Sequence, residues 1–346
     1  MSDRMSDEKL KDVGELGLLA LLRPMLERHT AGMPLGTGDD VAMTAHEGRQ
    51  RLAWTIDTMI EGTHFRWWND PLATAASLGY KLVAVNASDL ASKGAAPFFG
   101  LISIGVPAGE STERIRDFYQ GVDEGFAKLG GRLIGGDTVR APQWCVTLAL
   151  VGEVAADLTI AARSNAKPGQ GVYVTRATGD SAAGLAILEG TLSAPEPARS
   201  TLINAHLRPQ LSASRGIELV RKHPGLAMID VSDGIVNDCG QIARSSSTCI
   251  DVYTSGMDNG EWKTGRKPIP ISDALLEACD GDRAKAEKFA LYGGEDYCLL
   301  FCTPQPVDEN DSCFQIGEVV AGSGVRLVSP DGTHKAPQMQ GFSHFQ

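Results

Sequence analysis

The hydrophobic residues in the first half of the chain follow two different periods. Residues 71–94 and 111–130 repeat apolar positions at the three- and four-residue spacing of an amphipathic helix. The first of these helices is expected to begin near Pro71 and to stop at Gly94. A short strand should lead into the GGD motif at 135–137. Longer apolar runs, typical of buried strands, cover residues 51–57, 98–106 and 145–154.

The second half continues the alternation after a crossing segment at residues 155–170. Strand-like runs are found at 171–176, 226–232 and 291–302. Helical patterns cover 181–190, 211–223 and 233–246, with one or two helices over 273–289. This order predicts an α/β or α+β protein of two units, residues 1–155 and 156–346.

Composition narrows the class of protein. The hydrophobic share of 42% and the charged share of 22% are ordinary for a globular chain, and no run approaches a membrane span or a signal segment. A net charge of −11 without a basic run makes nucleic acid and anionic membranes poor partners. The seven scattered cysteines indicate reduced thiols in the cytoplasm, with Cys298 and Cys302 expected in the core.

Six acidic motifs stand where apolar segments meet loops. A single aspartate at such a place usually forms a turn or caps a helix, and Asp233 is a good candidate N-cap for the helix that follows it. Asp89 does not fit this interpretation, because it falls near the C-terminal end of a predicted helix, where the helix dipole disfavours an anion. The motifs are GDD (38–40), TIDT (55–58), NASD (86–89), GGDT (135–138), IDVSDG (229–234) and GGED (293–296).

Taken together, the acidic motifs indicate oxygen ligands for a hard cation such as Mg²⁺. Several Mg²⁺ ions held by aspartates would suit a triphosphate, because the cations bridge its oxygens and neutralise charge during phosphoryl transfer. The chain has no Walker A motif, no GxGxxG after a strand, no HExxH and no GxSxG. The sequence therefore favours a nucleotide-using enzyme without a P-loop.

A set of longer motifs occurs in one order along almost the whole chain. They are GTGDDVA (36–42), TIDTMIEGTHF (55–65), LGYKLVAVNASDLASKGAAP (78–97), IGGDTVR (134–140), RSNAKPGQGVYVTRATGDSAAGLAIL (163–188), IDVSDGIVND (229–238) and GGEDYCLLF (293–301). With them the chain resembles the thiamine-monophosphate kinase family, in the superfamily of aminoimidazole ribonucleotide synthetase, selenophosphate synthetase and a hydrogenase-maturation factor. The absence of a cysteine before Cys145 and the C-terminal HFQ argue against the last two.

The resemblance implies a kinase that uses ATP and Mg²⁺ to convert thiamine monophosphate into thiamine diphosphate by direct in-line transfer, with no covalent nucleophile. It also implies an aminoimidazole-ribonucleotide-synthetase-like fold. The N-terminal α/β domain would carry most of the ATP and Mg²⁺ site, and its sheet would pair with its twin so that a homodimer closes a β-barrel. The C-terminal α/β domain would complete the active site.

The resemblance also assigns roles to single residues, beginning with the metal site. Thr55 would add an oxygen, and at Ile56 only the main-chain carbonyl could serve. Asp39 is expected either to shape the turn or to support the ligands from behind, without binding the metal itself. Lys93, near Asp89, stands where the family commonly has Met and is either a surface charge or a salt partner. The complete set of implied Mg²⁺ ligands is Asp40, Thr55, Ile56, Asp57, Asp89, Asp137, Asp230 and Asp233.

Further residues resemble contacts with the two substrates. A glycine lets the backbone approach phosphate, and an arginine can bind it through two hydrogen bonds. A histidine suits the monophosphate, and a carboxylate suits the cationic thiazolium or the aminopyrimidine. For Tyr119, core packing is an equal alternative. Nucleotide contacts are expected from Tyr119, Gly136, Asp137, Arg163 and Ser232, and substrate contacts from His64, Glu295 and Phe342.

Two other functions are compatible with these motifs. One is an ATP-using synthetase of the same superfamily that acts on a different phosphorylated metabolite. The other is a non-catalytic metal- or nucleotide-binding protein that has kept the fold, which the departures at Ile56 and Lys93 would fit. A panel of phosphorylated substrates with ADP release as the readout separates these alternatives from the kinase.

Overall fold

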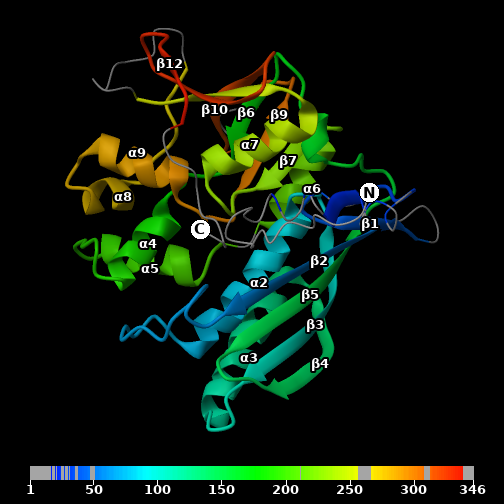
Figure 1. The fold of residues 1–346 in the computed structure, drawn as a ribbon, viewed down its shortest axis with the longest axis vertical. Helices are drawn as coiled ribbons and strands as arrows, with labels where there is room; N and C mark the ends of the chain where they lie inside the picture. The colour runs from blue at the N-terminus through cyan, green and yellow to red at the C-terminus, as the bar shows by residue number, and fades with distance from the viewer. Residues whose placement is uncertain are drawn as a thin grey trace, which may run out of the picture.

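The chain forms two β-sheets with helices packed against them (Figure 1). The computed structural model describes residues 38–46, 51–210, 212–255, 266–307 and 312–337, together with residues 17, 20, 22–24, 27, 30 and 32–35. The predicted mixed α/β class is therefore confirmed. One sheet uses strands from residues 42–154 and the other uses strands from residues 171–335. The two-domain division near residue 155 stays a prediction, because one apolar cluster contains both Leu90 and Phe301.

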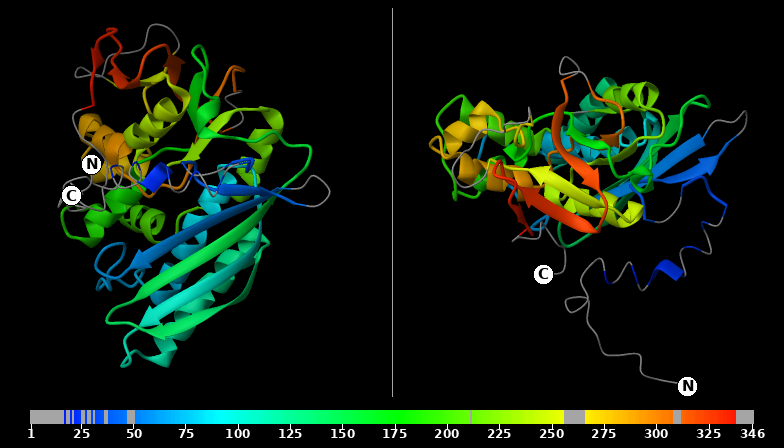
Figure 2. Two further views of the ribbon diagram at one scale, coloured as in Figure 1. Left: turned by 45° about the vertical axis from the view of Figure 1, so that its right-hand side comes forward. Right: turned by 90° about the horizontal axis from the view of Figure 1, so that it is seen from above.

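The first sheet has the strand order β1-β2-β5-β3-β4. Only the β3–β4 pair is parallel, and the other pairs are antiparallel. Helices α2 (Ala75–Ala91) and α3 (Thr112–Leu129) lie together on one face of this sheet (Figures 1 and 2). The strands are β1 (Ala42–Ala45), β2 (Arg51–Ile60), β3 (Ala96–Val106), β4 (Arg132–Arg140) and β5 (Cys145–Val154).

Buried and partly buried residues alternate along β5, so the sheet has one face covered by helices and one open face. Every second residue of β5 is buried, and Val146, Leu148 and Leu150 pack against the helices. The helices themselves approach closely. A Cβ atom at Gly121 would lie 1.8 Å from the Ala76 carbonyl oxygen, so only glycine fits there.

The opposite face of the first sheet carries exposed apolar side chains. Ile56, Leu101 and Ile134 are 67%, 51% and 58% exposed. Ile56 and Leu101 both pair with Ala149 of β5, so they belong to one row across the sheet. No described element covers this face, and the sheet is open at its edges (Figure 2, left). A barrel within one chain is therefore not formed by the described strands.

The second sheet has the order β12-β11-β8-β10-β6-β9-β7. Strand β10 is at the centre, β6 and β9 are neighbours, and β7 lies at the edge beside β9, next to α2. The strands are β6 (Gly171–Val174), β7 (Ala227–Asp230), β8 (Cys249–Tyr253), β9 (Leu299–Thr303), β10 (Phe314–Val320), β11 (Gly324–Val328) and β12 (His334–Lys335).

Four helices of the second half gather around an apolar cluster of their own, at the left of Figure 1. They are α4 (Asp180–Leu188), α5 (Ala198–Leu207), α8 (Asp273–Ala278) and α9 (Arg283–Tyr292). Three further helical elements are α6 (Ala213–Lys222), α7 (Ile235–Ser246) and the short 3-10 helix η2 (Arg163–Asn165). None of the described helices is long and apolar enough to cross a membrane.

Several sequence predictions need correction at the ends of elements. Helix α2 begins after Thr74, whose side chain caps it, and not near Pro71, because the Thr74 hydroxyl accepts the Ser77 amide hydrogen. It ends at Ser92, two residues before Gly94. The GGD motif at 135–137 lies inside β4, whose pairing with β3 continues to Arg140. Only the end of the predicted strand at 291–302 is a strand, since α9 extends to Tyr292.

Candidate metal and phosphate site

Three aspartates that are distant in the sequence meet where the turn before β1, the end of α2 and the end of β7 come together. Asp40 precedes β1, Asp89 is in the last turn of α2, and Asp230 ends β7. One carboxylate oxygen from each lies within 4.8 Å of the other two. Three carboxylates at this separation repel one another in the absence of a cation, so the arrangement fits a divalent ion.

Asp57 joins this group from β2. It pairs with the buried Leu148 across the β2–β5 ladder, which places its side chain on the helix-covered face of the sheet. Its Oδ2 atom is buried and has no hydrogen-bond partner. Burial raises the pKa of Asp57 to about 6, and the charge of Asp40 adds to the rise, although a hydrogen bond with Asp89 opposes it. An orphaned carboxylate oxygen in an all-oxygen set is what Mg²⁺ would satisfy.

Neighbouring hydroxyl groups hold two of these carboxylates in place. Thr55 donates a hydrogen bond to Asp89, and Ser88 donates one of 2.7 Å to Asp230. Burial raises the pKa of Asp230 to about 7, and burial together with the charges of the other aspartates raises that of Asp89 well above its usual range. Both causes, burial and repulsion between carboxylates, would be relieved by a cation bound among them.

Asp39 and Asp40 instead contact fixed cations. The Lys93 ammonium, which is fully buried, lies 2.6 Å from Asp39 Oδ1 and 2.5 Å from Asp40 Oδ2. The Arg163 guanidinium bonds Asp40 Oδ1 through both Nε and Nη2. Burial raises the pKa of Asp40, but the charges of Lys93 and Arg163 outweigh it, so the pKa is lowered. Lys93 is therefore a salt partner, and its alternative as a surface charge is wrong.

The turn at Asp39 also connects to the second half of the chain. Asp39 Oδ1 accepts the amide hydrogen of Asp40, and Asp39 Oδ2 accepts that of Arg163 at 3.0 Å. The expectation that Asp39 shapes the turn is confirmed. Arg163 reaches further, with its Nη1 3.2 Å from Gln241 Oε1 on α7. The guanidinium thus lies at the edge of the carboxylate cluster, between the turn and α7.

A second polar group surrounds Glu295. Its Oε2 lies 3.2 Å from the buried Lys81 Nζ and 3.3 Å from His206 Nδ1. Burial, and then the charge of Lys81, lowers the pKa of His206 to about 3, so this imidazole is neutral. Burial raises the pKa of Glu295, but the charge of the Lys81 ammonium outweighs burial and the pKa is lowered. Lys81 and His206 thus fix the orientation of the Glu295 carboxylate.

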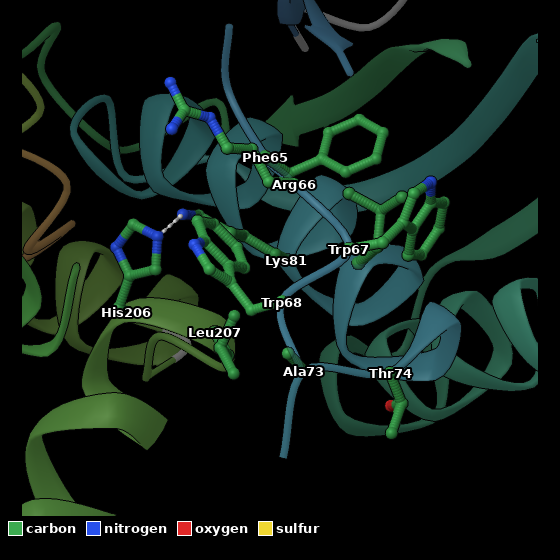
Figure 3. A pocket seen from close by; sticks show the side chains of 10 residues that line it. Phe65, Arg66, Trp67, Trp68, Ala73, Thr74, Lys81, His206 and Leu207 are labelled. Atoms are coloured by element: carbon green, nitrogen blue, oxygen red, sulfur yellow. Dashed lines mark hydrogen bonds between the residues drawn. The ribbon is translucent and has the colours of Figure 1, made fainter. Parts of the chain in front are cut away.

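An aromatic hollow borders this group (Figure 3). Its wall includes Trp68, whose ring meets that of His206 edge to face at a centroid distance of 5.9 Å. The first residue of its lining, Phe65, directly follows His64 in the sequence. The Nδ1 atom of His64 accepts the Ile60 amide hydrogen. Aromatic rings of this kind can stack on a flat heterocycle, but the hollow has a volume of only about 20 Å³, so its walls would have to move apart to admit one. The residues that line the hollow are Phe65, Arg66, Trp67, Trp68, Ala73, Thr74, Leu78, Lys81, His206 and Leu207.

Three residues expected to bind the nucleotide or the metal lie away from the cluster within one chain. Asp137 is exposed on β4 and pairs with Ser103, which is exposed on the open face of the sheet. Gly136 precedes it, and a Cβ atom there would lie 1.9 Å from the Ile102 carbonyl oxygen, so close strand packing already requires this glycine. Tyr119 on α3 packs against the core with its ring 5.4 Å from that of Phe118. The structure does not bring these residues to Asp57.

The remaining expected residues follow β7 or lie outside the described residues. The Ser232 carbonyl accepts the Glu295 amide hydrogen at 2.7 Å, so this loop connects the two polar groups. The alternative prediction that Asp233 is the N-cap of α7 is wrong, because the N-cap residue is Gly234. The side chain of Ile56 faces the open side of the sheet, which leaves only its main chain to serve the site. Phe342 lies outside the described residues.

Sequence reasoning did not identify Lys81, His206 and Asp238 as members of these groups. Lys81 and His206 lie on helices and become partners only through the tertiary fold. Asp238 accepts the Asp233 amide hydrogen at 3.2 Å, and its Oδ1 is buried without a partner. Its position five residues after Asp233 in the VSDGIVND segment was the one available signal.

Comparisons with known proteins agree with this geometry. Residues 38–154 match the family described as AIR synthase related protein, N-terminal domain. The thiamine-monophosphate kinase of Salmonella typhimurium is 36% identical over 296 residues, which cover 84% of this chain and 83% of that protein. The thiamine-monophosphate kinase of Aquifex aeolicus is 30% identical over 341 residues, which cover 97% of this chain and 100% of that protein.

Solved structures similar to this chain include two from the same family of kinases. The structure of AaThiL complexed with AMPPCP and TMP has a TM-score of 0.84 and 29% identity, and the match covers 99% of this chain and 100% of that one. The thiamine-monophosphate kinase of Stenotrophomonas maltophilia K279a has a TM-score of 0.70 at 29% identity, over 91% of this chain and 96% of that one. HypE, a hydrogenase maturation protein of E. coli, shares the fold at a TM-score of 0.66 and 18% identity, over 92% of this chain and 97% of that one.

Proposed function

The chain belongs to the thiamine-monophosphate kinase family, and from that premise we infer that it transfers the γ-phosphoryl group of ATP to thiamine monophosphate. An oxygen of the monophosphate attacks the γ-phosphorus in line, and the bond from that phosphorus to the β–γ bridging oxygen breaks. The products are thiamine diphosphate and ADP. The observation that carries this proposal is the meeting of Asp40, Asp57, Asp89 and Asp230 in one cluster. A different superfamily substrate is not favoured by the relatives.

We propose that this cluster holds Mg²⁺ through Asp57, Asp89 and Asp230, with Asp40 beside them. Bound Mg²⁺ would neutralise charge on the phosphate oxygens during transfer. The protein contributes to catalysis by preorganising the ligands. The Thr55 and Ser88 hydroxyls fix the directions of the Asp89 and Asp230 carboxylates before the substrate binds. Thr55, the Ile56 carbonyl and Asp233 remain proposed further ligands.

We propose that the nucleotide phosphates bind beside Arg163 and Ser232. Arg163 is held at the edge of the cluster by Asp40 and Gln241, so its guanidinium is oriented toward an anion without further ordering. Ser232 lies in the loop that follows Asp230. Gly136, Asp137 and Tyr119 stay proposed nucleotide contacts, with Tyr119 also part of the core.

For thiamine monophosphate, we propose His64 and Glu295 as contacts. The carboxylate of Glu295 is held by Lys81 and stays ionised, which suits the cationic thiazolium or the aminopyrimidine. The aromatic hollow beside it supports placing a heterocycle there. Phe342 remains a proposed stacking partner on the basis of the resemblance.

We also propose a homodimer in which the open face of the first sheet is covered by the same face of a second copy, closing a β-barrel. The exposed Ile56, Leu101 and Ile134 support it, because apolar side chains gathered on one face mark an interaction surface. Asp137 lies on β4, the edge strand of this sheet, so we propose that β4 of one copy lies beside the site of the other and that Asp137 completes that metal and nucleotide site. A cytoplasmic location stays a prediction, supported by seven free cysteines.

A kinase assay tests the proposed function directly. Purified protein is incubated with thiamine monophosphate and ATP, with and without Mg²⁺, and thiamine diphosphate is measured by chromatography. We expect the product only with Mg²⁺. ADP release measured with a panel of other phosphorylated metabolites is the control for substrate choice. No thiamine diphosphate at ample Mg²⁺, with turnover of another substrate, would overturn the proposal.

A further inference from the structure

The ammonium of Lys93 lies inside the acidic site and is saturated with acceptors. It contacts Asp39 Oδ1 at 2.6 Å, Asp40 Oδ2 at 2.5 Å and the Met228 carbonyl oxygen at 2.9 Å. An ammonium has three N–H donors, so these three acceptors use all of them. The residue is fully buried, and water therefore does not screen its charge.

The position of Lys93 follows from the three segments that carry the carboxylates. It comes four residues after Asp89, just past the end of α2, and Met228 is two residues before Asp230 on β7. Its two carboxylate partners belong to the turn before β1. One side chain thus connects the turn, the end of α2 and β7.

Both carboxylate oxygens of Asp40 already accept hydrogen bonds from side chains. Its Oδ2 accepts from Lys93 and, at 2.8 Å, from Ser92, while its Oδ1 accepts from Arg163. A divalent ion bridging Asp39 and Asp40 would have to displace a buried ammonium that bonds both. The site formed by Asp57, Asp89 and Asp230 makes no such demand, because the hydrogen-bond donors to Asp89 and Asp230 are the Thr55 and Ser88 hydroxyls and not the Lys93 ammonium.

We propose that Lys93 is a built-in cation of the phosphate site, which takes the place of one divalent ion at the Asp39–Asp40 pair. This inference rests on the proposed Mg²⁺-dependent function, and it assigns Lys93 as a positioning residue that acts through the two carboxylates. The enzyme then works with one divalent ion fewer than the same site would bind without the lysine. Its glycine-rich turn is also held in place before any metal or ATP binds.

Counting bound Mn²⁺ tests this assignment. The full chain with AMPPCP is titrated with Mn²⁺, and free Mn²⁺ is followed by electron paramagnetic resonance. We expect Lys93→Met to bind one more Mn²⁺ per chain than the wild type, because removal of the ammonium frees the carboxylate pair. Lys93→Arg, which keeps the charge, should bind the wild-type number. Equal numbers for wild type and Lys93→Met would overturn the proposal.

A second variant keeps the test decisive if Lys93→Met does not fold. In the wild-type background, Asp39→Asn should leave the Mn²⁺ number unchanged, because Asp39 then serves the lysine and not a metal. Loss of one Mn²⁺ in Asp39→Asn would overturn the proposal. Failure of the proposed function looks different, since the wild type would then bind no Mn²⁺ with AMPPCP or form no thiamine diphosphate.

Discussion

The side chains of Asp57 and Asp137 lie on opposite faces of the same sheet. Asp57 shares the helix-covered face with Leu148, and Asp137 is aligned with Ser103 on the open face. Both residues are expected at one metal and nucleotide site. A single chain does not bring them together, so the pair is united only if the edge strand β4 of one copy lies beside the site of another.

This relationship predicts complementation between two inactive variants. Asp57→Asn and Asp137→Asn should each remove most kinase activity while the fold is kept. When the two are unfolded together and refolded, about half of the dimers are mixed, and each mixed dimer has one intact site. Activity should therefore return to about a quarter of the wild-type value. The measurement is the rate of thiamine diphosphate formation before and after mixing.

The control mixes Asp57→Asn with Asp89→Asn. Both residues face the same cluster within one chain, so neither site of a mixed dimer is intact and no activity should return. Recovery in this control, or its absence in the first mixture, would show that Asp137 does not serve the other copy.

The open face also predicts how the dimer can be dissociated. Ile56→Asp puts a carboxylate in the middle of the exposed apolar row, where a partner would bury it, and an unpaired buried charge is strongly unfavourable. We expect the variant to be a folded monomer with little kinase activity, by sedimentation and circular dichroism. Phe314→Asp is the matched control, because this exposed phenylalanine lies on β10 of the other sheet. A variant Ile56→Asp that stays dimeric would contradict the proposed interface.

Elements with strong periodicity could be predicted from the sequence, and short buried ones could not. The bounds of β5 and α3 agree with the prediction to within a residue, because alternation marks one and the apolar stripe between Ser111 and Gly130 marks the other. Strand β8 was missed, since all five of its residues are buried and no alternation distinguishes it. The order of the second sheet depends on non-local pairing that no local pattern specifies.

Some residues of the site could likewise be predicted from the sequence, and others could not. The acidic motifs indicated Asp40, Asp89 and Asp230 as a group, because only a shared ligand explains so many carboxylates at element ends. Lys81 could not be found, because its partner Glu295 is 214 residues away and a lysine on an apolar helix usually extends to the surface. The opposite faces of Asp57 and Asp137 needed the strand register, since a one-residue shift exchanges the faces.

The raised pKa values predict how metal-free protein responds to pH. Asp57 and Asp230 have ordinary values of 3.8 and folded values of about 6 and about 7, so the folded state holds protons that the unfolded chain releases. The free energy of unfolding should therefore fall as pH rises from about 4 to about 7 and then level off. For each group the fall is about 1.4 kcal/mol per unit of difference between the folded and unfolded pKa values. Thermal unfolding in EDTA across this range measures it.

Two further measurements identify the source of that pH dependence. Asp57→Asn should reduce the slope without removing it, because Asp296 also has a pKa of about 7. Added Mg²⁺ should raise the melting temperature most above pH 7, where the ligands are ionised. A melting temperature that rises with pH in EDTA would show that these carboxylates are not held protonated in the fold.

The Lys81–Glu295 pair predicts a separation between binding and turnover. Lys81→Met removes the cation that orients Glu295, so the KM for thiamine monophosphate should rise about tenfold or more, equivalent to one lost charged hydrogen bond of 1.5–3 kcal/mol, with a smaller change in kcat. The double variant Lys81→Met/Glu295→Gln should regain stability, because no unpaired carboxylate remains, but not substrate affinity. Lys222→Met, in an exposed pair with Glu218, is the control and should change neither quantity measurably. An unchanged KM in Lys81→Met, measured by steady-state kinetics on folded protein, would remove Glu295 from the proposed substrate contacts or Lys81 from its support.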